Sequence, residues 1–96
     1  MWQRMVGLLD RRSLPDNEAL LIPHCQSIHM FFMRFPIDVI FLDKDLRVVG
    51  LVRNIKPFHL SPIFFRASSA IEGAVGMIER SQTQLGDLLE IKESNN

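Results

Sequence analysis

The feature that most constrains this chain is a long apolar stretch that begins at Cys25 and ends at Asp43. It is rich in Phe, Ile and Val, which favour strands, and Pro36 interrupts it where a continuous ladder would lose a hydrogen-bond donor. The pattern predicts two consecutive buried strands, 28–33 and 37–42, paired as a hairpin or as a sharply bent strand pair. Both faces of these segments are largely apolar, which indicates central positions in a sheet that is covered on both sides.

The remaining segments add short strands and little helix. Residues 2–12 have the spacing of a short amphipathic helix, 54–66 is interpreted as a partly buried loop, and Gly50 marks a bulge or a barrel corner. Further strands are predicted over 19–22, 47–53, 69–75 and 88–91, with one or two helical turns over 77–84. We therefore expect a mainly β (α+β) fold, a compact antiparallel small barrel or sandwich of five to six short strands with one short N-terminal helix.

Length and composition predict a single domain over residues 1–96. A chain of 96 residues with 47% hydrophobic content can bury one core but not two. With 11 basic and 11 acidic residues the formal net charge is zero. The chain as a whole therefore has no positive electrostatic field that would attract nucleic acid. The N-terminus lacks the order of a signal peptide, and no apolar run approaches the ~18 residues of a membrane span. We expect a cytoplasmic protein with no nucleic-acid partner, no membrane partner and no cofactor.

Several short motifs along the chain resemble the domain-of-unknown-function family 192. They are Gly7-Leu8-Leu9, Leu21-Ile22-Pro23, Ser27-Ile28-His29, Pro36-Ile37-Asp38, Phe41-Leu42-Asp43, Ile71-Glu72 and Gly86-Asp87. The resemblance covers nearly the whole chain. It implies a compact, mainly β fold with a short helix, found in bacteria and archaea, and no established activity.

Two departures from the family pattern affect what the resemblance implies. Family members usually have an additional strand before the Gly7-Leu8-Leu9 segment, so we expect that strand to be missing here, unless the true start lies upstream of Met1. Gly73 follows Glu72 where the family favours Leu, which removes an apolar anchor and leaves the register of that strand uncertain.

His29 and Asp38 are the polar residues that are most awkward to bury. An imidazole in an apolar strand must be neutral with both nitrogens satisfied, or charged and paired, and a core histidine is the simpler interpretation. Asp38 faces the same way as Ile40 and Leu42, so it is awkwardly placed unless its carboxyl group caps backbone donors at the turn. A three-residue hairpin loop would place His29 and Asp38 on opposite faces of the sheet, and a one-residue shift would leave them roughly 13 Å apart, which argues against an acid–base dyad.

The other candidate site residues are Glu72, Arg12, Cys25 and Met33. Glu72 shares a strand face with two alanines, which favours either a shallow pocket or an exposed glutamate. Arg12 is a surface charge or the partner of Asp38 or Glu72, and Met33 is core filler or part of a binding surface. Cys25 is a small buried hydrophobe rather than a nucleophile. His24, Cys25, His29 and His59 do not have the spacing of a zinc site, so no metal is predicted.

These observations favour a non-catalytic binding or interaction module with a small polar pocket. It would bind an unidentified small molecule or protein and exist as a monomer or weak homodimer. The alternative is a small acid–base, hydrolase-like enzyme that uses His29 with Asp38 or Glu72. A third interpretation is an interaction subunit with an exposed apolar edge.

Overall fold

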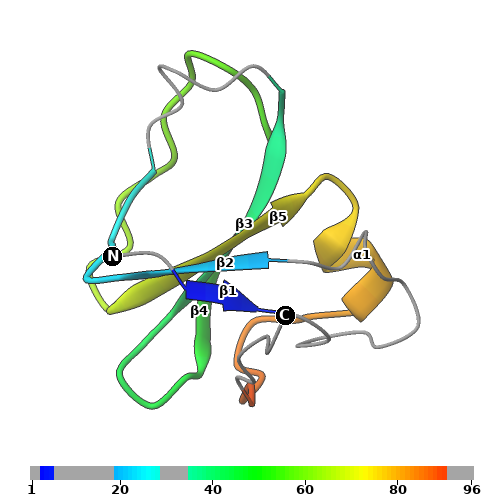
Figure 1. Ribbon diagram of the computed structural model, residues 1–96. Coiled ribbons are helices and arrows are strands. Elements are labelled where there is room, and N and C mark those ends of the chain that lie inside the picture. The colour runs from blue at the N-terminus through cyan, green and yellow to red at the C-terminus, as the bar shows by residue number, and fades with distance from the viewer. Residues whose placement is uncertain (1–2, 6–18, 29–34, 91–96) are drawn as a thin grey trace.

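The structure, a computed structural model, describes residues 3–5, 19–28 and 35–90 (Figure 1). Its elements are β1 (Gln3–Met5), β2 (Ala19–Pro23), β3 (Ile37–Leu42), β4 (Val48–Ile55), β5 (Ser69–Ala74) and α1 (Met77–Ser81). The prediction of a compact, mainly β fold with one short helix is confirmed, but that helix is α1. The predicted N-terminal helix is wrong at Gln3–Met5, which form a strand, and its remaining residues lie outside the described part of the chain.

The strands form one antiparallel sheet in the order β1-β2-β5-β3-β4. β3 therefore lies between β4 and β5, and its ladders with both run from Ile37 to Leu42. The predicted hairpin between 28–33 and 37–42 is wrong, because both edges of β3 are already paired. The strand count of five to six and closure into a barrel or sandwich stay predictions, as does the missing first strand of the family.

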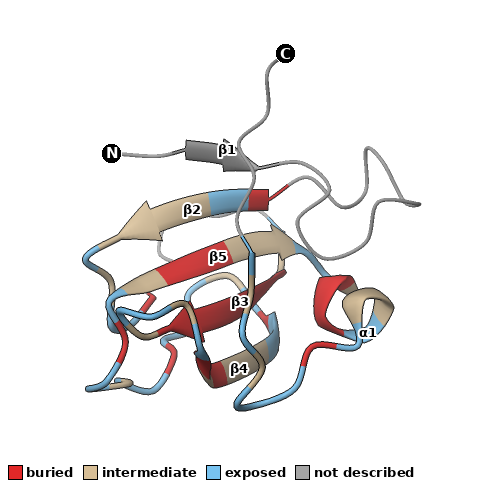
Figure 2. Cartoon of the chain, turned by 90° about the horizontal axis from the view of Figure 1, so that it is seen from below, coloured by how far each residue is buried: buried red, intermediate tan, exposed pale blue. Residues whose placement is uncertain are grey.

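β3 is the centre of the core, as its sequence predicts. All six of its residues are buried, with exposed fractions of 0–3% (Figure 2). Its side chains alternate between two apolar clusters, because successive residues of a strand point to opposite faces. One cluster lies on the α1 face and contains Ala19, Ile40, Leu42, Val48, Ile71, Met77 and Ile78. The other lies on the opposite face and contains Ile28, Ile37, Val39, Phe41, Ile55, Ala67 and Ala70.

Two irregularities in the β3–β4 ladder bend β4. The register shifts once between Ile37 and Val39 and again between Phe41 and Leu42, each time by one extra residue on β4. The second shift lies beside Gly50, which confirms the bulge predicted there. A Cβ at Gly50 would collide with the ring of Phe64, which packs against Phe41 with ring centroids 4.5 Å apart. Glycine is needed here because a loop side chain lies directly on the strand.

The register of β5 is continuous despite Gly73. Its ladder with β3 runs without a shift from Ala74 opposite Ile37 to Ser69 opposite Leu42. A side chain at position 73 would collide with the sulfur of Met77, the first residue of α1. The apolar anchor missing from β5 is therefore supplied by the helix.

The chain after β4 forms a loop, as predicted, and returns along residues 25–28. Backbone N–H groups of Ser61 and Phe64 donate to the carbonyls of Ile28 and Gln26, both at 2.8 Å. After α1 the chain forms an isolated bridge from Leu88 to Arg47, the residue before β4, and residues 88–90 form no longer strand; residue 91 of the strand predicted over 88–91 lies outside the described part of the chain. No helix in the described residues is long and apolar enough to cross a membrane.

Candidate functional site

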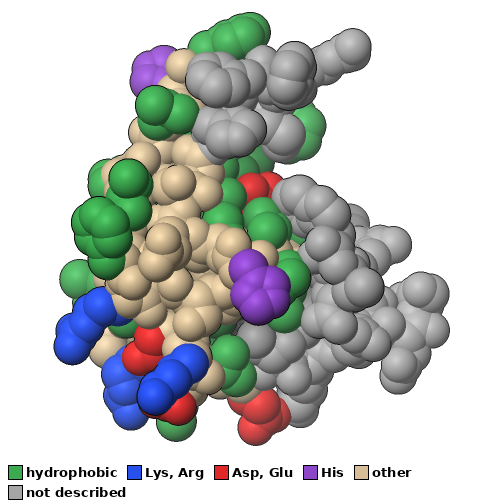
Figure 3. Space-filling view, turned by 90° about the vertical axis from the view of Figure 1, so that its left-hand side faces the viewer, with side chains coloured by type: hydrophobic (Ala, Val, Ile, Leu, Met, Phe, Trp, Pro, Cys, Tyr) green, Lys and Arg blue, Asp and Glu red, His purple; other side chains and the backbone are tan. Residues whose placement is uncertain are grey.

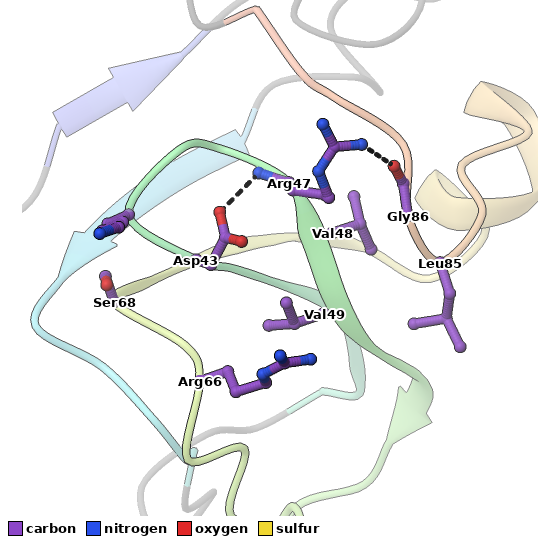
Figure 4. A pocket seen from close by; sticks show the side chains of 9 residues that line it. Asp43, Arg47, Val48, Val49, Arg66, Ser68, Leu85 and Gly86 are labelled. Carbon is purple, nitrogen blue, oxygen red and sulfur yellow. Dashed lines mark hydrogen bonds between the residues drawn. The ribbon is translucent and has the colours of Figure 1, made fainter.

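A shallow groove of about 610 Å³ lies beside the turn that joins β3 and β4 (Figure 4). Three separate stretches of chain line it: the turn with the start of β4, residues 66–68 before β5, and residues 85–86 after α1. The lining residues are Asp43, Lys44, Arg47, Val48, Val49, Arg66, Ser68, Leu85 and Gly86. The tertiary fold builds the groove, since these stretches are far apart in the sequence.

Asp43 fixes the shape of the turn. Its Oδ1 accepts hydrogen bonds from the backbone N–H groups of Asp45 (2.8 Å) and Arg47 (3.0 Å). The hydrogen bond from the Arg47 N–H has the largest effect and lowers the pKa of Asp43. The hydrogen bond from Asp45 and the positive charges of Arg47 and Arg66 lower this pKa further. The carboxylate is therefore already committed to the turn, as expected for an aspartate at this position.

Arg47 ties the turn to the segment that follows α1. Its guanidinium donates to the carbonyl of Gly86 at 2.8 Å, and the backbone of Val48 exchanges hydrogen bonds with Asp87 and Gly86 at 2.8 and 2.9 Å. One wall of the groove is thus held by main-chain contacts. The groove wall is preformed, which reduces the entropy that a ligand would have to overcome.

The charge around the groove is mainly positive. Lys44, Arg47 and Arg66 line it together with a single carboxylate, Asp43. Its floor includes Val48 and Val49, so polar and apolar surfaces meet there, which is typical of ligand sites. Arginine presents a planar fork of donors that matches carboxylate and phosphate groups. The arrangement is suited to binding a small anionic group.

Asp38 lies far from this groove, in the core. It is 2% exposed. The backbone N–H of Asn54 donates to its Oδ1 at 2.9 Å, and those of Gly76 and Ile78 donate to its Oδ2 at 3.1 and 3.0 Å. Asp38 thus ties the bulge of β4 and the start of α1 to the central strand, as its burial requires.

Glu72 and Cys25 lie on the sheet face opposite Asp38. Glu72 pairs with Val39 and so shares the face of the second cluster, against which Cys25 also packs. Glu72 is half-buried, and burial raises its pKa. Burial also raises the pKa of the Cys25 thiol, and the negative charge of Glu72 raises this pKa further. A raised pKa disfavours the reactive thiolate.

Of the predicted site residues, the structure describes Asp38, Glu72 and Cys25, and it does not bring these three into one site. Asp38 and Glu72 occupy opposite faces of the sheet, and His29, Arg12 and Met33 lie outside the described residues. Within the described part of the chain, no three His, Cys, Asp or Glu side chains are grouped so that they could hold a metal ion.

Sequence reasoning did not identify the groove, although one signal for it was present. Between residues 46 and 71 the chain has four basic residues, Arg47, Arg53, Lys56 and Arg66, and no Asp or Glu. The zero net charge of the whole chain conceals this local excess. Charge counted segment by segment would have drawn attention to Arg47 and Arg66.

The fold is a small antiparallel β domain, and its groove is lined by three cations and one carboxylate. The model of the family "Uncharacterized ACR", domain of unknown function 192, matches residues 1–91, so the chain belongs to that family. This confirms the resemblance found in the sequence.

Named relatives and one solved structure are also similar to the chain. It is 44% identical to UPF0127 protein TK1120 of Thermococcus kodakarensis over 63 residues, 66% of this chain and 40% of that protein. It is 46% identical to UPF0127 protein PH1112 of Pyrococcus horikoshii over 61 residues, 64% of this chain and 52% of that protein. The chain therefore matches only about half the length of these curated relatives.

The similar solved structure is a protein of unknown function from Novosphingobium aromaticivorans. Its TM-score is 0.68 at 27% identity, and the match covers 88% of this chain and 64% of that chain. The likeness shows that a second protein of unknown function shares this fold.

Proposed function

We propose that this protein is a non-catalytic binding module whose groove takes a carboxylate or phosphate group of a small molecule or protein partner. The observation that carries the proposal is that Lys44, Arg47 and Arg66 all line one groove. Asp43, the carboxylate that lines it, accepts two backbone hydrogen bonds through Oδ1 and so does not neutralise the three cations fully.

The surroundings of the cations support an anionic ligand. Arg66 is exposed and comes from a different stretch of chain than Arg47, so a ligand that contacts both would join two segments of the fold (Figure 4). A hydrogen bond to a charged group contributes about 1.5–3 kcal/mol. Contacts with two arginines would give measurable but modest affinity in an open site.

The acid–base enzyme is less well supported by the described residues. Asp38 has both oxygens engaged by backbone donors in the core, where it cannot meet a substrate. Glu72, the other carboxyl group suggested as a partner of His29, lies on the opposite face of the sheet, and His29 itself lies outside the described residues. We therefore retain the binding module as the proposal.

Titration with inorganic phosphate and with citrate at low ionic strength tests the proposal, with binding followed by amide shifts in two-dimensional NMR. We expect shifts at residues 43–48, 66–68 and 85–87. The variant Arg66→Gln is expected to weaken binding by roughly tenfold or more. Arg53→Gln removes an exposed cation that does not line the groove and serves as the control. Absence of shifts at the groove with both anions, or equal affinity of the two variants, would refute the proposal.

A further inference from the structure

The loop between β4 and β5 exposes large apolar side chains. Phe58, Leu60, Ile63 and Phe65 are 72%, 66%, 57% and 79% exposed, and we call this set the apolar loop surface. Hydrophobic side chains follow one border of the molecule in Figure 3, above a cluster in which Lys and Arg lie among Asp and Glu. Single exposed apolar residues are common, but four within eight positions form a patch that marks an interaction surface.

The exposure is built into the fold, because the loop is held in place by hydrogen bonds on its inner side. The backbone N–H of Ile28 donates to Oγ of the buried Ser61 at 2.8 Å, and the Gln26 amide donates to the Phe65 carbonyl at 2.9 Å. Phe64 meanwhile turns inward to pack on Phe41. The loop therefore presents its remaining apolar side chains outward from a fixed backbone.

Phe58 occupies a strained backbone position. Residues 56–59 form a turn closed by a hydrogen bond from the His59 N–H to the Lys56 carbonyl at 3.1 Å. Phe58 is the third residue of this turn and has a φ of 64°, a conformation that glycine or asparagine adopts most readily. A strained phenylalanine whose ring lies mostly in solvent has no evident use in folding. Such strain is typical of functional positions.

The charge of this region indicates the kind of surface that it meets. Residues 46–71 contain four Lys or Arg and no Asp or Glu, whereas the whole chain has equal numbers of basic and acidic residues. Lys56 and Arg66 directly flank the apolar loop surface. Exposed apolar side chains beside Lys and Arg are the combination that attaches proteins to anionic bilayers, where the cations meet headgroups and the apolar side chains enter the acyl boundary.

The shape of the region separates a lipid surface from a peptide partner. The four side chains of the apolar loop surface project from the loop and do not line the grooves at the β3–β4 turn, beside α1 or beside His24. A peptide needs a groove for its side chains, whereas a bilayer receives side chains that project from the protein.

We propose that the apolar loop surface inserts into the interfacial region of an anionic lipid bilayer, with Lys56 against the headgroups. This goes beyond the anion-binding groove and does not depend on it. The expectation of no membrane partner rested on the net charge and on the absence of a spanning segment. Neither argument bears on a loop that binds from one side.

Flotation with lipid vesicles tests the proposal. The parent protein should float with vesicles of equal parts phosphatidylcholine and phosphatidylglycerol, and not with phosphatidylcholine alone. The double variant Phe58→Ser/Phe65→Ser should lose roughly tenfold in affinity per side chain. The control Leu20→Ser/Leu88→Ser removes two exposed leucines, 40% and 63% exposed, from elsewhere and should bind like the parent. Lys56→Glu should weaken binding to the anionic vesicles.

A fluorescence measurement reports insertion directly. The chain has one tryptophan, so the variant Trp2→Phe/Phe58→Trp carries its only indole on the apolar loop surface. Its emission should shift to shorter wavelength on addition of anionic vesicles, and an unshifted emission overturns the proposal. Flotation that survives in the serine double variant overturns it as well. Binding to polyglutamate without flotation would assign the surface to an acidic protein partner and would also overturn it.

Discussion

Replacing Asp38 by asparagine removes one acceptor from the centre of the core while keeping the size of the side chain. The Asp38 carboxylate accepts hydrogen bonds from the backbone N–H groups of Asn54, Gly76 and Ile78, which are 16, 38 and 40 residues away in the sequence. The amide oxygen of asparagine can still accept the two hydrogen bonds from the N–H groups of Gly76 and Ile78. Its NH₂ group would then face the N–H of Asn54, and a donor would be left without an acceptor.

The loss of free energy follows from these contacts. One unsatisfied buried donor costs about 1–3 kcal/mol, and the two retained bonds weaken because the acceptor is no longer charged. Removal of a buried charge offsets part of this cost. We therefore expect Asp38→Asn to lower the free energy of unfolding by about 2–3 kcal/mol. A domain of this size has roughly 5–14 kcal/mol in total, so the variant should fold.

Urea unfolding followed by far-ultraviolet circular dichroism measures the effect. With a slope of about 1–3 kcal/mol per M, the midpoint should fall by about 0.7–3 M. Asp45→Asn removes an equal charge from an exposed position of the β3–β4 turn and should change stability by no more than about 0.5 kcal/mol. Hydrogen exchange should also accelerate at the amide of Asn54. Equal midpoints for the two variants, with unchanged exchange at Asn54, would refute this account of Asp38.

Two further predictions concern Gly50 and Glu72. Gly50→Ala should lower the free energy of unfolding by about 1–3 kcal/mol through overpacking, because its Cβ would collide with the ring of Phe64. Thermal unfolding measures this loss of stability, and the double variant Gly50→Ala/Phe64→Leu should recover part of it. Glu72→Gln should stabilise the protein at neutral pH, because burial raises the pKa of Glu72 in the folded state and penalises its charged form. That gain should shrink as the pH falls through the raised pKa and vanish below the unfolded value of ~4.3, and a gain that is constant with pH would contradict it.

The sequence predicted the local elements well where one physical pattern dominated. The β3 segment has six consecutive residues suited to burial, so its bounds were predicted as Ile37–Leu42, as observed. The same holds for the strand that starts at Ala19 and for the helical turns that start at Met77. Strand alternation placed Asp38 on the face of Ile40 and Leu42, but its donors come from Asn54, Gly76 and Ile78 and not from the turn where they were expected.

The errors came from assuming that neighbours in sequence are neighbours in space. The predicted hairpin paired β3 with the segment before it, whereas its actual partners are β4 and β5. The N-terminal helix was predicted from the helical spacing of apolar residues over 2–12. At Gln3–Met5 the chain instead forms a strand that pairs with β2. Local periodicity does not encode such long-range pairing.

The sequence by itself determined that this chain has a mainly β fold, that Asp38 shares a strand face with Ile40 and Leu42, and that the chain belongs to an uncharacterised family. These follow from apolar patterning, alternation and family motifs, which are properties of contiguous residues. Only the tertiary structure decided which donors Asp38 receives, that Asp38 and Glu72 lie on opposite faces, and that Lys44, Arg47 and Arg66 meet in one groove. The physical reason is that the order of the strands in the sheet, and the path of the loops between them, bring together residues that are far apart in the sequence.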